Sequence, residues 1–145
     1  MRTINSLLQS ALKVNLPYEI ELSLIESSED FVRLQKEQLS VGEKSDGQNI
    51  FNVKTGSDQY SPAYAKKKGK SSPIDLHDKG DFYGGIFLDV RADEMIVDSA
   101  DSKSGMLQER YSDKVFGLAD DRKAVFAPIA ASHLVSNIQK ELNRT

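Results

Sequence analysis

The sequence predicts an α+β fold in which N-terminal helices and a C-terminal helix pack on a small, curved antiparallel sheet. Apolar residues recur with helical spacing near both ends of the chain, and period-two alternation runs through the middle, around residues 82–97. The stretch IELSLI, residues 20–25, also alternates with period two, so the first turn of the helix predicted there could instead be a strand. The length of 145 residues is typical of one domain that buries its own core. We therefore predict a single domain over residues 1–145, with a long exposed loop at about 54–75.

Two N-terminal helices are predicted before Gly42, which is a natural helix stop. The first helix has Thr3 as a candidate N-cap and carries an apolar stripe at positions i, i+3, i+4, i+7 and i+8. Pro17 suits the first turn of the second helix, because its ring fixes a helical φ and an N–H would go unpaired there. The first stripe consists of Ile4, Leu7, Leu8, Ala11 and Leu12, and the second of Ile20, Leu24, Phe31 and Leu34.

The middle of the chain is dominated by turns and one hairpin. Residues 54–75 contain four turn-forming Gly and Pro residues and complete neither a helical nor a strand period, so we assign them to a loop. Alternation from Phe82 to Val90, followed by a polar turn and the apolar residues 95–97, predicts an antiparallel hairpin. The Gly84–Gly85 pair inside its first strand indicates a bulge or a close backbone approach.

The C-terminal part is predicted to end in a helix. A short helical stretch around residues 106–111 comes first, and residues 115–118 form either a third strand or a buried turn that ends at Asp120 and Asp121. We place Pro128 in the first turn of the last helix, where its missing N–H costs nothing. The apolar positions of that helix are Ala131, Leu134, Val135, Ile138 and Leu142.

Composition excludes several functional classes. The chain has no Cys, so it forms no disulfide, thiolate metal site or thiol nucleophile. No apolar stretch approaches the roughly 18 residues that span a bilayer, and the N-terminus does not resemble a secretory signal. A net charge of -3 offers no global attraction to nucleic acid, so any contact with DNA must be local. We expect no membrane partner.

The two histidines are the first candidates for catalysis or metal binding, because imidazole titrates near neutral pH. His77 lies beside Asp75, Asp78 and Asp81, but no second His with ligand spacing accompanies it. We interpret this stretch as a polar turn in which Asp78 or Asp81 caps backbone amides and Gly80 is left-handed, with a metal-dependent hydrolase as the competing hypothesis. His133 lies in the last predicted helix, where a half-buried packing role is expected. We predict no catalytic residue, no metal and no cofactor, and therefore no enzyme.

The most distinctive segment is YSPAYAKKKGKSS, in which two tyrosines precede four lysines. Tyrosine rings stack on bases and lysines pair with phosphates, so a small nucleic-acid-binding module that uses the lysines at 66–70 is one hypothesis. A flexible segment that contacts another protein is the hypothesis we favour, and a solvated loop without a role is the third. The predicted partner-binding residues are Tyr60, Tyr64, Lys66, Lys67, Lys68 and Lys70.

The order of these features resembles the small morphogenesis proteins of tailed bacteriophages. In the tail-completion and head-tail joining families, a basic Tyr/Lys segment commonly precedes Leu, one or two residues, Thr-Gly and an apolar strand. Lys79 stands here where those families usually place Thr. The residues that match are Tyr64, Lys66, Lys67, Lys68, Leu76, Asp78, Gly80 and Phe82.

This resemblance implies a ring-forming structural subunit of the virion neck, located in the virion and in the host cytoplasm during assembly. It implies homo-oligomerisation and contact with neighbouring virion proteins, and it leaves room for contact with DNA that passes through the channel. The 54–75 loop is then expected to reach a neighbouring subunit or the next ring.

Overall fold

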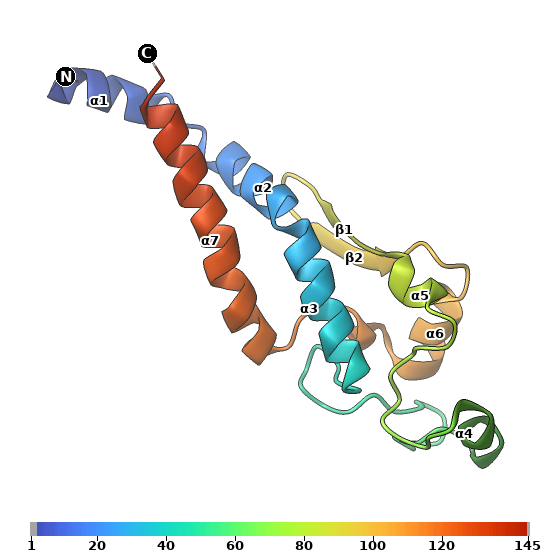
Figure 1. Cartoon of the computed structure of the whole chain (residues 1–145). Coiled ribbons are helices and arrows are strands. Elements are labelled where there is room, and N and C mark those ends of the chain that lie inside the picture. Colours follow the sequence, from blue (N-terminus) through green and yellow to red (C-terminus); the bar gives the residue numbers. More distant parts are fainter. Residues whose placement is uncertain (1–2, 145) are drawn as a thin grey trace.

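The chain is an α+β protein with seven α-helices and a two-stranded antiparallel sheet in the part described by the computed structural model, residues 3–144. Helix α1 and the C-terminal end of α7 lie at one end of an elongated molecule, α7 runs alongside α2 and α3, and α4 lies at the opposite end (Figure 1). No helix within residues 3–144 is both long and apolar enough to cross a membrane. The elements are α1 (Ile4–Leu12), α2 (Leu16–Glu26), α3 (Ser28–Ser40), α4 (Pro62–Lys68), α5 (Asp81–Gly84), β1 (Ile86–Val90), β2 (Met95–Ser99), α6 (Ser104–Tyr111), a 3-10 turn at Asp113–Val115 and α7 (Asp120–Leu142).

The N-terminal region begins as predicted and then departs from the prediction. Thr3 caps α1 by accepting a hydrogen bond from the Ser6 N–H at 3.1 Å, and Pro17 lies in the first turn of α2. The predicted second helix is divided into α2 and α3 at the buried Ser27. Its hydroxyl donates to the Ser23 carbonyl at 2.7 Å, and such local bonds compete with helix propagation.

The hairpin pairs β1 with β2 in the register Ile86 with Ser99 and Val90 with Met95. Its first strand starts later than predicted, because residues 81–84 form the short helix α5 after a left-handed Gly80 with φ of 91°. Of the two interpretations of the glycine pair, a close approach is the one observed. A Cβ on Gly85 would lie 2.7 Å from Ser99 Oγ and 2.9 Å from the Asp101 backbone N, whereas a Cβ on Gly84 would meet nothing within 4 Å.

Gly85→Ala should therefore destabilise the hairpin, because the added methyl group meets backbone atoms that cannot rotate away. We expect a loss of about 1–3 kcal/mol in the free energy of unfolding, the usual range for overpacking. Gly84→Ala is the matched control, and it should be neutral or stabilising by about 0.5–1 kcal/mol because Ala favours helix. Urea unfolding of the two variants measures the difference, and equal stabilities would contradict the assigned contact.

The C-terminal region corrects one prediction. Helix α7 begins at Asp120, so Pro128 lies inside the helix and not in its first turn. Asp120 and Asp121 occupy the first turn, where carboxylates interact favourably with the helix dipole. Phe126 stabilises this earlier start because its ring packs edge-on against that of Phe31, with the ring centres 5.3 Å apart. Residues 115–118 form a buried turn and no strand, which agrees with one of the two predicted alternatives.

Two buried glutamines of α3 hold this turn in place. Gln35 Nε2 donates to the Val115 carbonyl at 3.1 Å, and Gln35 Oε1 accepts from the Gly117 N–H at 2.8 Å. Gln38 repeats the pattern with the Gly117 carbonyl at 2.8 Å and the Ala119 N–H at 2.7 Å. Both side chains are fully buried at 0% exposure. The turn thus obtains from side chains the backbone hydrogen bonds that a strand would obtain from a neighbour.

Candidate functional site

The segment at 54–75, predicted as a loop without regular structure, contains helix α4 (Pro62–Lys68). Ser61 caps the helix by accepting from the Tyr64 N–H at 3.3 Å, Pro62 occupies its first turn, and Gly69 ends it in the left-handed conformation with φ of 89°. Ser, Pro and Gly at these positions are ordinary helix start and stop signals. The helix was not predicted because the three consecutive lysines interrupt any apolar stripe.

The end of this segment is attached to the protein's core. Residues 53–59 and 70–73 are exposed, as the prediction requires, but Ile74 is buried in the larger core cluster with Leu39, Phe82 and Val115. Tyr60 is partly buried against the same cluster. The segment therefore lies at the surface between two residues, Tyr60 and Ile74, that pack against the core.

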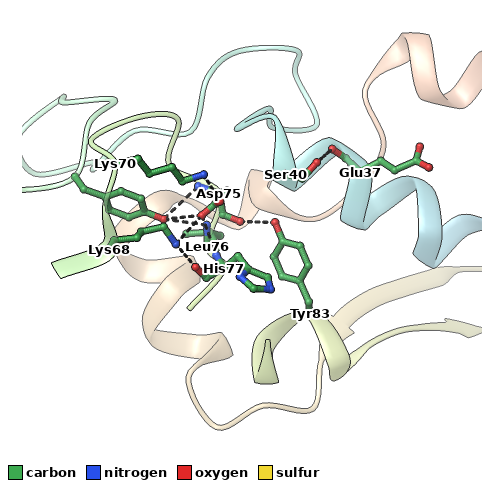
Figure 2. A network of polar contacts seen from close by, with 9 residues as sticks. Glu37, Ser40, Lys68, Lys70, Asp75, Leu76, His77 and Tyr83 are labelled. Carbon is green, nitrogen blue, oxygen red and sulfur yellow. Dashed lines mark hydrogen bonds and ion pairs between the residues drawn. The ribbon is translucent and has the colours of Figure 1, made fainter. Parts of the chain in front are cut away.

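Asp75 lies at the centre of a network of polar contacts that holds this segment (Figure 2). Its carboxylate accepts from Lys70 Nζ at 2.6 Å and lies 3.1 Å from Lys68 Nζ, and its side chain is only 10% exposed. It also accepts from the His77 backbone N–H at 3.1 Å. The Tyr83 hydroxyl donates to the Asp75 carbonyl at 2.6 Å from the side of α5. The Asp75 carboxylate therefore connects the lysines to the turn at His77, and the Asp75 carbonyl connects this turn to α5.

Tyr60 completes the arrangement with a single hydroxyl group. Its Oη lies 3.1 Å from Asp75 Oδ1 as a donor, and it accepts from the backbone N–H groups of Asp75 and Leu76, each at 3.2 Å. Leu76 has a positive φ of 58°, a backbone conformation that residues other than Gly seldom adopt. The Tyr60 hydroxyl holds this backbone by bonding its N–H group.

The four lysines at positions 66–70 fall into two pairs with different surroundings. Lys68 and Lys70 both bind Asp75, and Lys68 also donates to the His77 carbonyl and lies 5.2 Å from the centre of the Tyr60 ring. Lys66 and Lys67 are exposed and make no ion pair with any described residue. Three of the six predicted partner-binding residues, Tyr60, Lys68 and Lys70, thus form polar contacts within the chain. The pairing of the two lysines with Asp75 lowers the charge that the segment offers to a phosphate backbone.

The electrostatics of the network follow from these contacts. Burial alone would raise the pKa of Asp75, but the hydrogen bonds from Lys70, the His77 N–H and Lys68 outweigh it and lower the pKa to about 2. Burial, together with the Asp75 charge, raises the pKa of Tyr60 and Tyr83. Asp75 is therefore ionised and both tyrosines are protonated at neutral pH.

The histidines lie in surroundings that account for them structurally. The His77 ring packs edge-on against Tyr83 at 4.9 Å, and the turn around it is capped by Asp75, not by Asp78 or Asp81 as predicted. Gly80 is left-handed, as predicted. Within residues 3–144 no group of three or more His, Asp or Glu side chains is close enough to hold a metal ion. His133 Nδ1 lies 3.5 Å from Glu26 and links α7 to α2.

A pocket of about 520 Å³ lies next to the network, between α4, α5 and α6. Tyr60 and Tyr64 line one side of it, with ring centres 4.9 Å apart. Burial raises the pKa of Tyr64, and the nearby Asp78 charge adds to the effect. Apolar side chains from the core and from α6 complete the lining, namely Leu76, Phe82, Met106, Leu107 and Tyr111.

The structure brings Tyr60, Tyr64 and Lys68 together at this site, whereas Lys66 and Lys67 extend into solvent. Sequence reasoning missed Asp75 as the partner of the lysines, Tyr83 as its second support and the contribution of α6 to the pocket. Only the first had a local signal: Asp75 is the nearest acidic residue after Lys68 and Lys70 in the sequence. No protein-family model, curated protein or solved structure matches this chain.

Proposed function

We propose that this chain is a non-enzymatic structural subunit of a tailed bacteriophage or prophage, a head-tail connector or tail-completion (neck) protein that acts by oligomerising into a ring. The order of the Tyr/Lys segment, Leu76, Gly80 and Phe82 supports the phage assignment through its resemblance to those families. The observation that carries the assembly role is the distribution of exposed apolar side chains.

Ten of the fifteen large apolar side chains that are exposed within residues 3–144 lie on α1, α2 and α7, and α7 contacts both of the other two helices. Contiguous apolar patches larger than a few hundred Å² mark interaction sites on soluble proteins. The ten residues are Ile4, Leu7, Leu8, Leu12, Leu16, Tyr18, Ile20, Ile25, Val125 and Val135.

Helix α2 packs on α7 with polar residues in the contact and leaves apolar residues exposed. Glu19 and Ser23 are the buried residues of α2, and Asn137 of α7 donates to Glu26 at 2.7 Å. A helix at the surface of a monomer usually buries its apolar stripe and exposes its polar face. Here α2 leaves Ile20 and Ile25 exposed, which favours a further protein surface as their partner.

The place of the protein in a particle is tested by immunogold electron microscopy. Antibody against the purified chain should label phage particles from the strain that encodes it, at the junction of head and tail. An antibody against the major capsid protein, which labels the head, is the control for particle integrity. Particles that carry the head label and lack the neck label would contradict the proposed role.

A further inference from the structure

The pocket between α4, α5 and α6 includes a carboxylate that has no partner in the described part of its own chain. Asp101 lines this pocket, and its Oδ2 atom is buried without a hydrogen-bond partner among residues 3–144. No cationic side chain within the same residues forms an ion pair with Asp101. Buried polar atoms of folded proteins almost always have a partner, so this oxygen requires a donor from outside the chain.

The backbone around Asp101 is held on both sides, which fixes the position of its side chain in the pocket wall. Its N–H donates to Ser99 Oγ at 3.3 Å, and its carbonyl accepts from the Ser104 N–H at 3.1 Å. The Gly85 backbone approaches so closely that a Cβ there would lie 2.9 Å from the Asp101 N. The χ2 torsion of an Asp is broad and nearly two-fold, so the carboxylate can turn its unpaired oxygen toward a donor while the backbone stays in place.

The remaining charged residues of the pocket lie at its rim. All five are exposed, whereas Asp101 is partly buried. Exposed charges stay hydrated, and the two signs at the rim largely offset each other. The charge inside the pocket is therefore negative, and it favours a cation. The five rim residues are Asp78, Lys79, Asp81, Lys103 and Arg110.

The uncharged lining is aromatic and apolar. Tyr60 and Tyr64 have ring centres 4.9 Å apart, and the buried Tyr111 adds a third ring. The faces of aromatic rings attract cations. Met106 and Leu107 of α6 offer contact to an apolar body, and the volume of about 520 Å³ is within the range of about 300–1,000 Å³ that small-molecule sites have. The lining thus suits a ligand that joins an apolar body to a positive charge.

We propose that this pocket binds a small organic amine, with its protonated nitrogen at the Asp101 carboxylate and its apolar body against α6 and the tyrosines. The ammonium group supplies the donor that Asp101 lacks, and a charge-assisted hydrogen bond is about twice as strong as a neutral one. A metal ion would need several ligands, and no group of three or more His, Asp or Glu side chains within residues 3–144 is arranged to hold one. The site goes beyond the proposed assembly role, because a single chain contains all of it.

Two compounds with the same body test the role of the charge. 2-Phenylethylamine has a phenyl ring and a protonated amine, whereas 2-phenylethanol has the ring and no charge. Isothermal titration calorimetry on the full chain should show that the amine binds about 10-fold or more tightly than the alcohol, because a hydrogen bond to a charged group is stronger. Equal affinities, or no binding of the amine at millimolar concentrations, would overturn the proposal.

Asp101→Asn tests the carboxylate itself. The change keeps the side-chain shape and breaks no side-chain contact with a described residue, so the fold is retained, which circular dichroism checks. It should weaken 2-phenylethylamine binding by about 10-fold or more and leave 2-phenylethanol binding unchanged. Asp93→Asn, at an exposed position of the hairpin turn, is the matched control and should change neither affinity. If Asp101→Asn binds the amine as tightly as the unmodified chain, the unpaired oxygen is served by an ordered water only and the proposal is wrong.

A third compound distinguishes a free amine from the lysine side chain of another protein. N-acetyl-lysine amide has the same ammonium group on a flexible chain without a ring, so it should bind more weakly than 2-phenylethylamine. Tighter binding of the lysine derivative would identify a protein lysine as the occupant and overturn the assignment of a small amine.

Discussion

Gln38→Leu should lower the free energy of unfolding by about 3 kcal/mol or more, the largest effect we expect from a single substitution. The change keeps the side-chain volume nearly constant, but it removes the acceptor for the Ala119 N–H and the donor for the Gly117 carbonyl. Each buried polar group left without a partner costs about 1–3 kcal/mol. Chemical denaturation followed by far-UV circular dichroism measures the loss.

The control for this prediction is Gln48→Leu, because Gln48 is exposed and no described residue pairs with its side chain. That variant should differ from the unmodified protein by less than about 0.5 kcal/mol. If Gln38→Leu were as stable as the control, the buried glutamines could not be what holds residues 115–119 against α3.

Asp75→Asn should lower stability by about 2 kcal/mol at pH 7, and the loss should depend on pH. The pKa of Asp75 is about 2 in the folded protein and 3.8 in the unfolded reference, so the folded state favours the ionised carboxylate. A depressed carboxyl pKa contributes stability that is fully present above the unfolded value and disappears as the pH falls through the folded value; a difference of nearly two units corresponds to about 2 kcal/mol. The stability difference between the variant and the unmodified protein should therefore shrink between pH 4 and pH 2.

Asp58→Asn is the matched control, because Asp58 lies in the same segment, is exposed and forms no ion pair with a described residue. Its stability should follow that of the unmodified protein at both pH values. A constant difference for Asp75→Asn across this range would mean that the lysines are not held by the ionised carboxylate.

The fold class was predictable because it depends on local patterns. The stripe beginning at Ile4, Thr3 as N-cap and the alternation ending at Val90 each determine an element without reference to distant residues. Errors arose where tertiary contacts overrode a local rule. Pro128 is tolerated inside α7 because Phe126 and the acidic first turn fix an earlier start. The strand before Gly85 was replaced by a helical turn because Gly80 takes the left-handed conformation.

The sequence identified several residues of the site but did not predict how they contact one another. Tyr60 and the lysines drew attention through composition, but the pairing of Lys68 and Lys70 with Asp75 depends on a chain reversal that no periodicity encodes. Gln35 and Gln38 gave no signal at all, because a glutamine in an amphipathic helix is normally assigned to the exposed face. Their partners lie about eighty residues further along the chain.

The native mass of the unmodified chain in solution tests the central claim most directly, because a ring requires this subunit to bind further copies of itself. Sedimentation velocity over a hundredfold range of protein concentration should show species heavier than 16.1 kDa that increase with concentration toward one closed assembly. A single 16.1 kDa species at every concentration would contradict it.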